Sequence, residues 1–298
     1  MIKTKNKLLL ITTPFSKLTT VPGTYSQVLD ELTKRFAVDV HTTAYPGDSF
    51  ETARKLSGDY DVICACGGDG TLNEIVRGVY LSGANTPIGV IPCGTGNIFA
   101  ASSGISRVPS EAARALVKGF DNPQKFDLGR MGENYFVFVA SFGYFTQAVN
   151  VTPRESKHAL GSLAYVLEGI KDIRTLKAYD LSFNADGVTH SGSYIFGSVT
   201  NSTQVCGLMQ LDPKVVSFGD GMFEVMLIKM PQNLSDLAQC VKQLSTMQYD
   251  RRNIDFFKAS SITVTRADST PWSLDGDPAN FEGIARIENI PRAISIIR

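Results

Sequence analysis

The sequence is poor in cysteine and histidine, and it carries no excess of charge of either sign. Five cysteines in 298 residues, without a paired zinc spacing, argue against a disulfide scaffold and favour buried thiols in a reducing compartment. Lysine and arginine total 29, as do aspartate and glutamate, which argues against a dedicated nucleic-acid-binding protein. No apolar run approaches the roughly 18 residues that span a bilayer, and no signal-peptide pattern opens the chain. We therefore expect a cytoplasmic protein that meets a membrane only from the water side.

Strand-like and helix-like patterns alternate over the first 120 residues. Short apolar runs predict strands at 8–12, 37–43, 61–66 and 87–91. Helical spacing of apolar residues, with turn residues between the segments, predicts helices at 25–36, 48–57, 72–81, 97–102 and 110–118. Such alternation is typical of βαβ units, and it predicts a parallel sheet covered by helices on both faces.

The pattern changes near Asn122-Pro123, after which strand-like segments dominate. Strands are expected there at 125–131, 135–140, 177–184, 188–200, 223–229, 261–265 and 293–297. Asp186-Gly187 stands between two alternating runs and predicts a β-hairpin. Helices are expected only at 160–173 and 234–247 in this part. The predicted fold class is α/β, with a parallel-sheet domain over 1–122 and a mainly antiparallel β-rich domain over 123–287. The strands around 288–298 are expected to return to the first domain.

The strongest motif is the run Gly67-Gly68-Asp69-Gly70-Thr71-Leu72-Asn73-Glu74, which follows a buried strand and opens a helix. Three glycines within four residues let backbone N–H groups approach a ligand closely. The helix N-terminus adds a positive dipole end, and the combination suits a phosphate group. Asp69 is unexpected in an anion site unless a Mg²⁺ ion lies between the carboxylate and the phosphates. The alternative is a tight turn in which Asp69-Gly70 only caps the helix.

Two further motifs support the first. Pro92-Cys93-Gly94-Thr95-Gly96-Asn97 also joins a strand to a helix, so the two glycine loops should lie side by side at the carboxyl edge of the sheet, where open α/β sheets bind ligands. Near the end of the chain, Trp272-Ser273-Leu274-Asp275-Gly276-Asp277 places two carboxylates around a glycine. Each carboxylate could act as a base or bind metal, although spacing alone favours an ordinary Asp-Gly turn.

Together these motifs resemble the diacylglycerol kinase catalytic family, which includes bacterial lipid kinases and sphingosine kinases. The landmarks stand in family order and extend over nearly the whole chain: 67–74, 92–97, Phe126-Asp127-Leu128-Gly129, Gly219-Asp220-Gly221-Met222-Phe223 and 272–277. The glycine motif at 67–71 alone is shared with NAD kinases, whereas the full series is specific to the lipid kinases. The resemblance implies an N-terminal ATP-binding domain, a C-terminal lipid-binding domain and an active site in the cleft between them.

The resemblance also implies roles for individual residues. Nucleotide contacts are implied at Thr13, Ser16, Thr43, Gly67, Gly68, Asp69, Gly70, Thr71, Leu72, Asn73, Glu74, Gly94, Thr95 and Asn97. Asp69 and Asp127 would hold the catalytic Mg²⁺ through water, and the Asp275–Asp277 pair would supply the general base for the lipid hydroxyl. A structural Mg²⁺ would lie at Ser217, Asp220 and Met222. The implied partners are ATP and a lipid at a membrane surface, most simply diacylglycerol.

The chain departs from the family pattern in three motifs, the first being Ile98, which follows G-T-G-N where the family often has Asp. The loop after the first strand usually reads N-P-x-S-G, and here it is Thr13-Pro14-Phe15-Ser16-Lys17. The last motif usually ends in Glu, whereas Asp277 is shorter by one methylene, about 1.5 Å. A base must come within about 2.6–3.2 Å of the proton it removes. A catalytically impaired homologue and a kinase of a soluble metabolite, of the NAD-kinase type, therefore stay open as alternatives.

Basic residues gather around the helix expected at 160–173: Arg154, Lys157, His158, Lys171, Arg174 and Lys177. They could contact anionic headgroups, as peripheral association with a membrane would require. Glu155, Glu168 and Asp172 are interleaved with them, so a solvated face is the competing interpretation. The sequence leaves a homodimer open.

Overall fold

The computed structural model describes residues 5–143, 167, 170–205, 209–267 and 270–298. The chain divides into two compact units, the first being Met1–Phe126 with Arg292–Arg298 and the second Asp127–Pro291. The boundaries expected from the sequence lie after residue 122 and near residue 288. The chain passes between the units twice, within the strands β5 (Gln124–Met131) and β17 (Ala285–Ile297).

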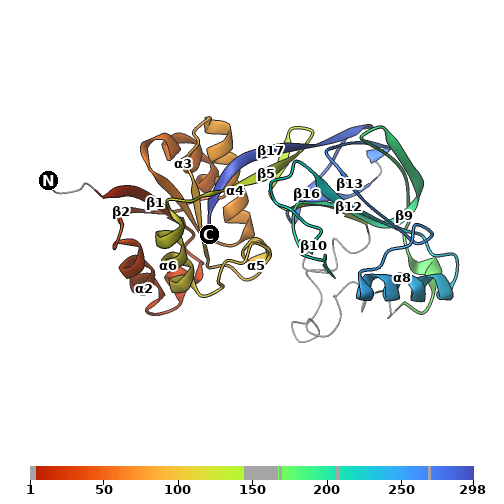
Figure 1. The fold of residues 1–298 in the computed structure, drawn as a ribbon, viewed down its shortest axis with the longest axis horizontal. Helices are drawn as coiled ribbons and strands as arrows, with labels where there is room; N and C mark the ends of the chain where they lie inside the picture. Colours follow the sequence, from red (N-terminus) through yellow and green to blue (C-terminus); the bar gives the residue numbers. More distant parts are fainter. Residues whose placement is uncertain (1–4, 144–166, 168–169, 206–208, 268–269) are drawn as a thin grey trace. The chain divides into compact units, whose positions relative to one another are not determined.

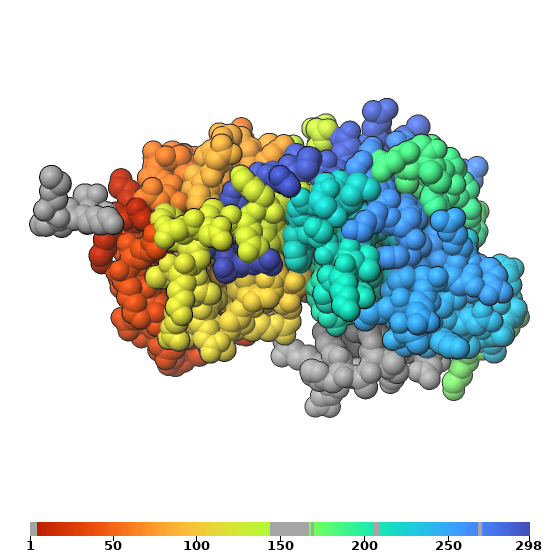
Figure 2. Space-filling view, viewed as in Figure 1, coloured from red at the N-terminus to blue at the C-terminus, as the bar shows by residue number. Residues whose placement is uncertain are grey.

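The first unit contains a parallel sheet with the order β17-β4-β3-β1-β2. Its strands, besides the end of β17, are β1 (Asn6–Thr12), β2 (Phe36–Thr42), β3 (Val62–Gly67) and β4 (Ile88–Pro92). The central strands are buried on both faces, which explains their continuous apolar runs. Figure 1 shows the blue end of β17 among elements coloured red to yellow, because Ile296 and Ile297 pair with β4. In Figure 2 the dark-blue atoms of the last residues lie among yellow atoms of this unit.

Helices pack in pairs in the first unit. The helical segments are α1 (Lys17–Thr20), α2 (Thr24–Leu32), α3 (Asp48–Leu56), η1 (Ser57–Asp59), α4 (Asp69–Ser82), α5 (Ile98–Ser102) and α6 (Pro109–Gly119). On one side, α2 contacts α6, and Arg114 donates to Oε1 of Glu31 at 2.8 Å. On the other, α3 lies against α4 so closely that a Cβ at Gly78 would stand 2.6 Å from the Phe50 carbonyl oxygen. Glycine at this position therefore permits the close approach of the two helices.

The second unit is built from antiparallel strands. They are β5, β6 (Asn134–Phe136), β7 (Val139–Gly143), β8 (Tyr179–Ala185), β9 (Val188–Thr200), β12 (Phe223–Lys229), β13 (Ile254–Ala259), β14 (Ser261–Thr265), β15 (Trp272–Leu274), β16 (Asp277–Ala279) and the first part of β17. The long strand β9 pairs with β8 over its first half and with β7 and β12 over its second half. A short ribbon joins β10 (Gln204–Val205) to β11 (Met209–Gln210), and two helical segments, η4 (Ile173–Thr175) and α8 (Leu234–Thr246), complete the described part.

Aromatic side chains dominate the core of the second unit. The Phe142 ring lies 5.0 Å from Trp272 and 5.9 Å from Phe183, measured between ring centroids. Gly197 makes room for it, because a Cβ there would lie 2.1 Å from the Phe142 ring. Outward positions of β8 are polar, so the strand alternates as a half-buried antiparallel strand should.

The structure confirms the predicted fold class, a parallel-sheet α/β part followed by an antiparallel β-rich part. The predicted hairpin at Asp186-Gly187 is also confirmed: both residues have positive φ, as the turn requires. The helix expected at 160–173 lies mostly outside the described residues. Four cysteines, Cys64, Cys66, Cys93 and Cys240, are buried free thiols. None of the described helices is long and apolar enough to cross a membrane.

Candidate active site

The two glycine loops contact each other directly. β3 and β4 are parallel neighbours, so both loops leave the same edge of the sheet. The carbonyl oxygen of Gly67 accepts hydrogen bonds from the N–H groups of Cys93 (2.9 Å) and Gly94 (3.1 Å). A Cβ at Gly94 would lie 2.4 Å from the Gly68 Cα, a distance that real side chains do not reach. The prediction that the loops lie side by side is confirmed, and glycine at 94 is required by their close approach.

Asp69 ties the first loop to the second. Its carboxylate accepts from the N–H groups of Ile98 and Phe99, both at 3.0 Å, at the start of α5. Asn97, in a left-handed conformation, closes the second loop by accepting from Gly94 N–H and donating to the Gly94 carbonyl. Each Asp69 oxygen therefore holds one backbone proton and retains acceptor capacity for a further partner. The role as a loop tie was not foreseen from the sequence.

A hollow of about 290 Å³ opens beside the first loop. It brings together four residues predicted to contact nucleotide, namely Thr13, Thr43, Thr71 and Glu74, from the ends of two strands and from α4. Its other lining residues are Pro14, Phe15, Ala44, Tyr45, Pro46, Gly47 and Ser49. Two aromatic residues in this set, Phe15 and Tyr45, were not predicted to lie at the site, although Phe15 stands in the loop that departs from the family pattern.

Other predicted nucleotide residues lie elsewhere. Ser16 is buried, and its hydroxyl lies 2.9 Å from the Thr12 hydroxyl. Leu72 and Asn73 are buried on α4, and the N–H of Leu72 donates to the Gly68 carbonyl within the helix. The side chains of these three residues are buried and do not line the hollow. Thr95, in contrast, is exposed in the second loop.

A buried carboxylate fixes one wall of the hollow. Asp48, only 6% exposed, accepts from Ala44 N–H (2.8 Å), from the His41 ring (3.1 Å) and from the Thr52 hydroxyl (3.1 Å). Burial alone would raise the pKa of Asp48, but these hydrogen bonds outweigh it and hold the pKa below its ordinary value. The loop at 43–47 is therefore pinned by an ionised group at its base.

The two carboxylates of the final motif have different surroundings. Asp275 sits in the turn between β15 and β16 with φ 52° and accepts from the N–H groups of Val137 (2.6 Å), Phe138 (3.1 Å) and Val139 (2.9 Å). Asp277 is exposed, and its carboxylate makes no hydrogen bond or ion pair with any residue that the structure describes. Asp275 thus holds the turn in place, whereas the Asp277 carboxylate is exposed to solvent.

Asp127 and the predicted metal loop meet in the second unit. Asp127, 1% exposed, donates its N–H to the Phe218 carbonyl, and its Oδ2 accepts from Gly221 N–H, both at 2.7 Å. Asp220 Oδ1 accepts from Met222 N–H at 3.1 Å, and its Oδ2 lies 3.1 Å from the Lys258 ammonium. Asp127 is therefore connected to the loop of Ser217, Asp220 and Met222.

Lys258 also reaches a buried carboxylate that the sequence analysis missed. Glu224 is 0% exposed, and its Oε1 lies 3.0 Å from the Lys258 ammonium. Burial raises the pKa of Glu224 to about 7, although Lys258 opposes the shift. When ionised, Asp220, Glu224 and Lys258 carry one net negative charge. Asp220 and the carbonyl groups of the loop supply the oxygen donors that a hard divalent cation prefers, but the Lys258 ammonium already occupies the Oδ2 side of Asp220. The sequence signal that could have identified Glu224 is its position as a single charged residue inside the apolar run 223–228.

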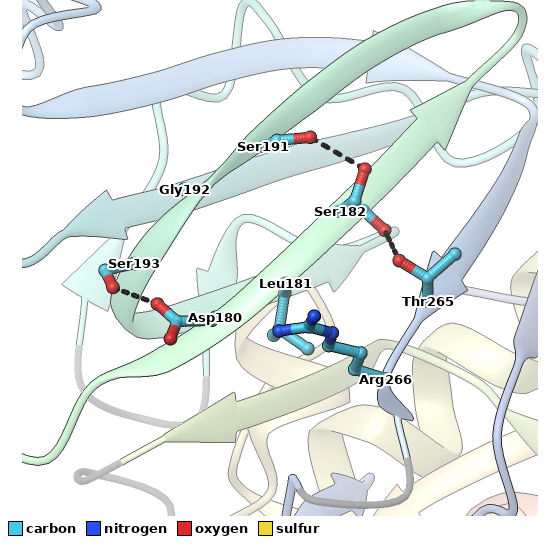
Figure 3. Close-up of a pocket in the computed structure, with 8 residues that line it drawn as sticks. All are labelled: Asp180, Leu181, Ser182, Ser191, Gly192, Ser193, Thr265 and Arg266. Atoms are coloured by element: carbon cyan, nitrogen blue, oxygen red, sulfur yellow. Dashed lines mark hydrogen bonds between the residues drawn. The ribbon is translucent and has the colours of Figure 1, made fainter.

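A second hollow, of about 460 Å³, lies on the outer face of β8, β9 and β14 (Figure 3). Its hydroxyl groups have partners within the lining: Ser182 pairs with Ser191 at 2.7 Å, Ser193 donates to the Asp180 carboxylate, and Thr265 donates to the Ser182 carbonyl. Because these groups already have partners, the hollow offers little to a ligand.

The basic cluster proposed for membrane contact is only partly described, since 154–158 lie outside the described residues. Arg174 is paired with Asp172 at 2.7 Å, and the Lys177 ammonium stands 5.2 Å from the centroid of the Tyr179 ring. These two cations therefore have intramolecular partners.

Comparison with known proteins agrees with this architecture. Residues 7–131 match the family model of the diacylglycerol kinase catalytic domain, and residues 138–298 match the YegS C-terminal NAD kinase beta sandwich-like domain. A diacylglycerol kinase of Bacillus subtilis is 30% identical over 88% of this chain and 88% of its own length. One from Staphylococcus aureus is 31% identical over 86% of this chain and 84% of its own.

Solved structures share the fold. One from Bacillus anthracis str. Sterne has a TM-score of 0.80 at 20% identity and covers 100% of this chain and 97% of its own. Another, described as a diacylglycerol kinase from the same strain, has a TM-score of 0.72 at 18% identity, covering 98% and 96%. The chain belongs to the diacylglycerol kinase family of lipid kinases.

Proposed function

We propose that the chain is an ATP-dependent lipid kinase that transfers the γ-phosphate of ATP to a lipid hydroxyl, with diacylglycerol as acceptor and phosphatidic acid as product. The observation that carries the proposal is the pair of glycine loops, joined by Asp69 and by the Gly67 carbonyl, beside a hollow lined by four predicted nucleotide residues. Backbone N–H groups and a helix N-terminus suit the phosphates of ATP.

In this proposal the carboxylates have separate duties. Asp277 accepts the proton of the acceptor hydroxyl, because its carboxylate is exposed and unpaired among the described residues. Asp275 positions the turn that carries it. As the acceptor oxygen forms its bond to the γ-phosphorus, the bond from that phosphorus to the bridging oxygen of ADP breaks in line. Mg²⁺ would neutralise charge on the phosphates when bound, and Asp69 retains acceptor capacity to hold it through water.

Meeting a lipid requires peripheral association with a membrane. A membrane surface would present diacylglycerol from its own plane, and the enzyme would approach it from the water. Flotation with anionic and with neutral vesicles tests this step. Preferential flotation with anionic vesicles supports peripheral binding through charge, and equal recovery with both removes charge as the cause.

The decisive experiment measures transfer of label from [γ-³²P]ATP with Mg²⁺ into a mixed-micelle panel of diacylglycerol, sphingosine, phosphatidylglycerol and NAD. Label in diacylglycerol that disappears in Asp277→Asn supports the proposal. Label in NAD alone supports a metabolite kinase instead, an alternative favoured by the NAD-kinase-like description of the C-terminal match. ATP binding without transfer to any acceptor, corrected by Asp277→Glu, identifies the shorter carboxylate as the cause of an impaired enzyme.

A further inference from the structure

Two exposed aromatic residues stand on the same hollow although they come from different loops. Phe15, in the loop after β1, is 89% exposed, and Tyr45, in the loop after β2, is 53% exposed. Single exposed aromatic residues are common on protein surfaces. Two of them on one concave wall, next to residues of the phosphate-binding loop, are a feature of a binding site.

The remaining lining is polar and available. The side chains of Thr13, Thr43, Thr71 and Glu74 make no hydrogen bond with the described part of the chain. Hydroxyls and a carboxylate suit the hydroxyl groups of a sugar, and aromatic faces suit a planar heterocycle. A volume of about 290 Å³ is near the lower limit for small-molecule pockets, so it suits one nucleoside.

The Tyr45 side chain is held in position before any ligand arrives, and the backbone beside Phe15 is fixed by a turn hydrogen bond. The Tyr45 hydroxyl donates to Glu51 at 2.7 Å, and Asp48 fixes the adjoining Ala44 N–H. Phe15 lies between Pro14 and Ser16, whose N–H donates to the Thr13 carbonyl at 3.2 Å. Groups held in this way lose little conformational freedom when a ligand binds.

We propose that Phe15 and Tyr45 hold the nucleobase of the phosphate donor by stacking, a step that rests on the proposed function because it takes a nucleoside triphosphate as donor. The base is recognised by its flat face and not by its edge. The N–H groups of Thr43 and Ala44, which could read an edge, already donate to the Thr12 carbonyl and to Asp48. The free hydroxyls are assigned to the sugar, and because each can donate or accept, none of them rejects either purine.

This recognition makes the donor site permissive. Sites that bind a base through fixed edge contacts reject the wrong base strongly, whereas apolar contact discriminates weakly. We therefore expect ATP and GTP to bind with dissociation constants within about tenfold of each other. Because every base has a π-face, both should depend on the same aromatic pair.

The test compares the Mg²⁺ complexes of ATP, GTP and inorganic tripolyphosphate by isothermal titration calorimetry. Phe15→Ala should weaken ATP and GTP by about 5- to 100-fold and leave tripolyphosphate unchanged. Phe15→Trp should restore binding, and nucleotide should quench its added fluorescence relative to wild type, which has Trp272 alone. Tyr45→Ala should weaken both nucleotides, while Tyr25→Ala, an exposed aromatic outside the hollow, is the matched control.

The possible failures are distinguishable. If wild type binds ATP but Phe15→Ala and Tyr45→Ala bind it equally well, the stacking proposal is overturned and the proposed kinase function survives. ATP binding more than 100-fold tighter than GTP binding overturns recognition by the flat face. If neither ATP nor tripolyphosphate binds, both the proposed function and the stacking proposal fail. Melting curves of each variant show that lost binding does not come from unfolding.

Discussion

Replacing Gly94 by alanine should separate the two glycine loops. The new Cβ would lie 2.4 Å from the Gly68 Cα and 2.9 Å from the Gly68 nitrogen. Carbon atoms in contact stay about 3.5–4.0 Å apart, so the loops must move by about 1 Å or more. Both groups are backbone atoms, and no side-chain rotation can relieve the contact. A displacement of this size at a binding site can cost about 100-fold.

The assay is calorimetric titration of the Gly94→Ala variant with Mg²⁺–tripolyphosphate, which reports on the loops without the nucleobase. We expect affinity to fall by about 100-fold and unfolding stability to fall by about 1–3 kcal/mol from overpacking. Gly58→Ala is the matched control, because no atom lies within 4 Å of its Cβ position.

Three results are informative. Unchanged affinity and unchanged stability would refute the close contact of the loops. Lower stability with unchanged affinity would confirm the contact but remove the loops from phosphate binding. Loss of affinity in Gly58→Ala as well would show that the measurement responds to substitution in general.

Three further predictions concern the carboxylates. Asp277→Asn should abolish phosphate transfer without a change in melting temperature. Asp275→Asn should lower both phosphate transfer and stability, the latter by about 2–3 kcal/mol, because one amide oxygen cannot replace a carboxylate that accepts three N–H bonds. Equal melting temperatures of the two variants would contradict this prediction. The raised pKa of Glu224, about 7 against an ordinary 4.5, favours the folded state at low pH and should reduce stability by about 3 kcal/mol as pH rises from about 4.5 to above 7. Urea denaturation at pH 5 and pH 8 should show that loss in wild type and not in Glu224→Gln. Arg114 and Lys34 lower the pKa of Glu31 to about 2, so its contribution is present above about pH 4.5 and is lost as pH falls toward 2; Glu31→Gln should unfold at a higher pH on acid titration, and coincident acid transitions would refute it.

Apolar and β-rich runs predicted the strands correctly where the apolar residues of the run are the ones that become buried. The strands at 188–200 and 223–229 were expected, because each is a β-rich run ended by turn residues. β13 was missed, since Asp255 and Lys258 interrupt its apolar pattern and find their charged partners far away in the sequence, among them Lys229 and Glu224 on β12. The short strands β15 and β16 were not expected, although an Asp-Gly turn was one interpretation of the motif between them, and pairing with β7 is what makes β15 a strand.

The candidate site was predicted in composition more than in arrangement. Spacing indicated that the glycine loops would be adjacent, because parallel neighbours end at one edge. It could not indicate that Asp69 bonds the N–H groups of Ile98 and Phe99, 29 and 30 residues away. Spacing also could not distinguish the roles of Asp275 and Asp277, because it does not indicate which of the two carboxylates accepts a hydrogen bond from the backbone of β7.

The strand β17 has a consequence for the order in which the protein acquires its structure during synthesis. Residues 292–298 complete the sheet of the first unit, yet the ribosome makes them after the whole second unit. Until then, β4 lacks its neighbour on one side, and Ser103 lacks the Arg298 side chain that donates to its carbonyl at 3.0 Å. The nascent first unit therefore has an unpaired apolar strand edge while more than half of the chain is still being translated. During this time the exposed edge can pair with other chains and aggregate.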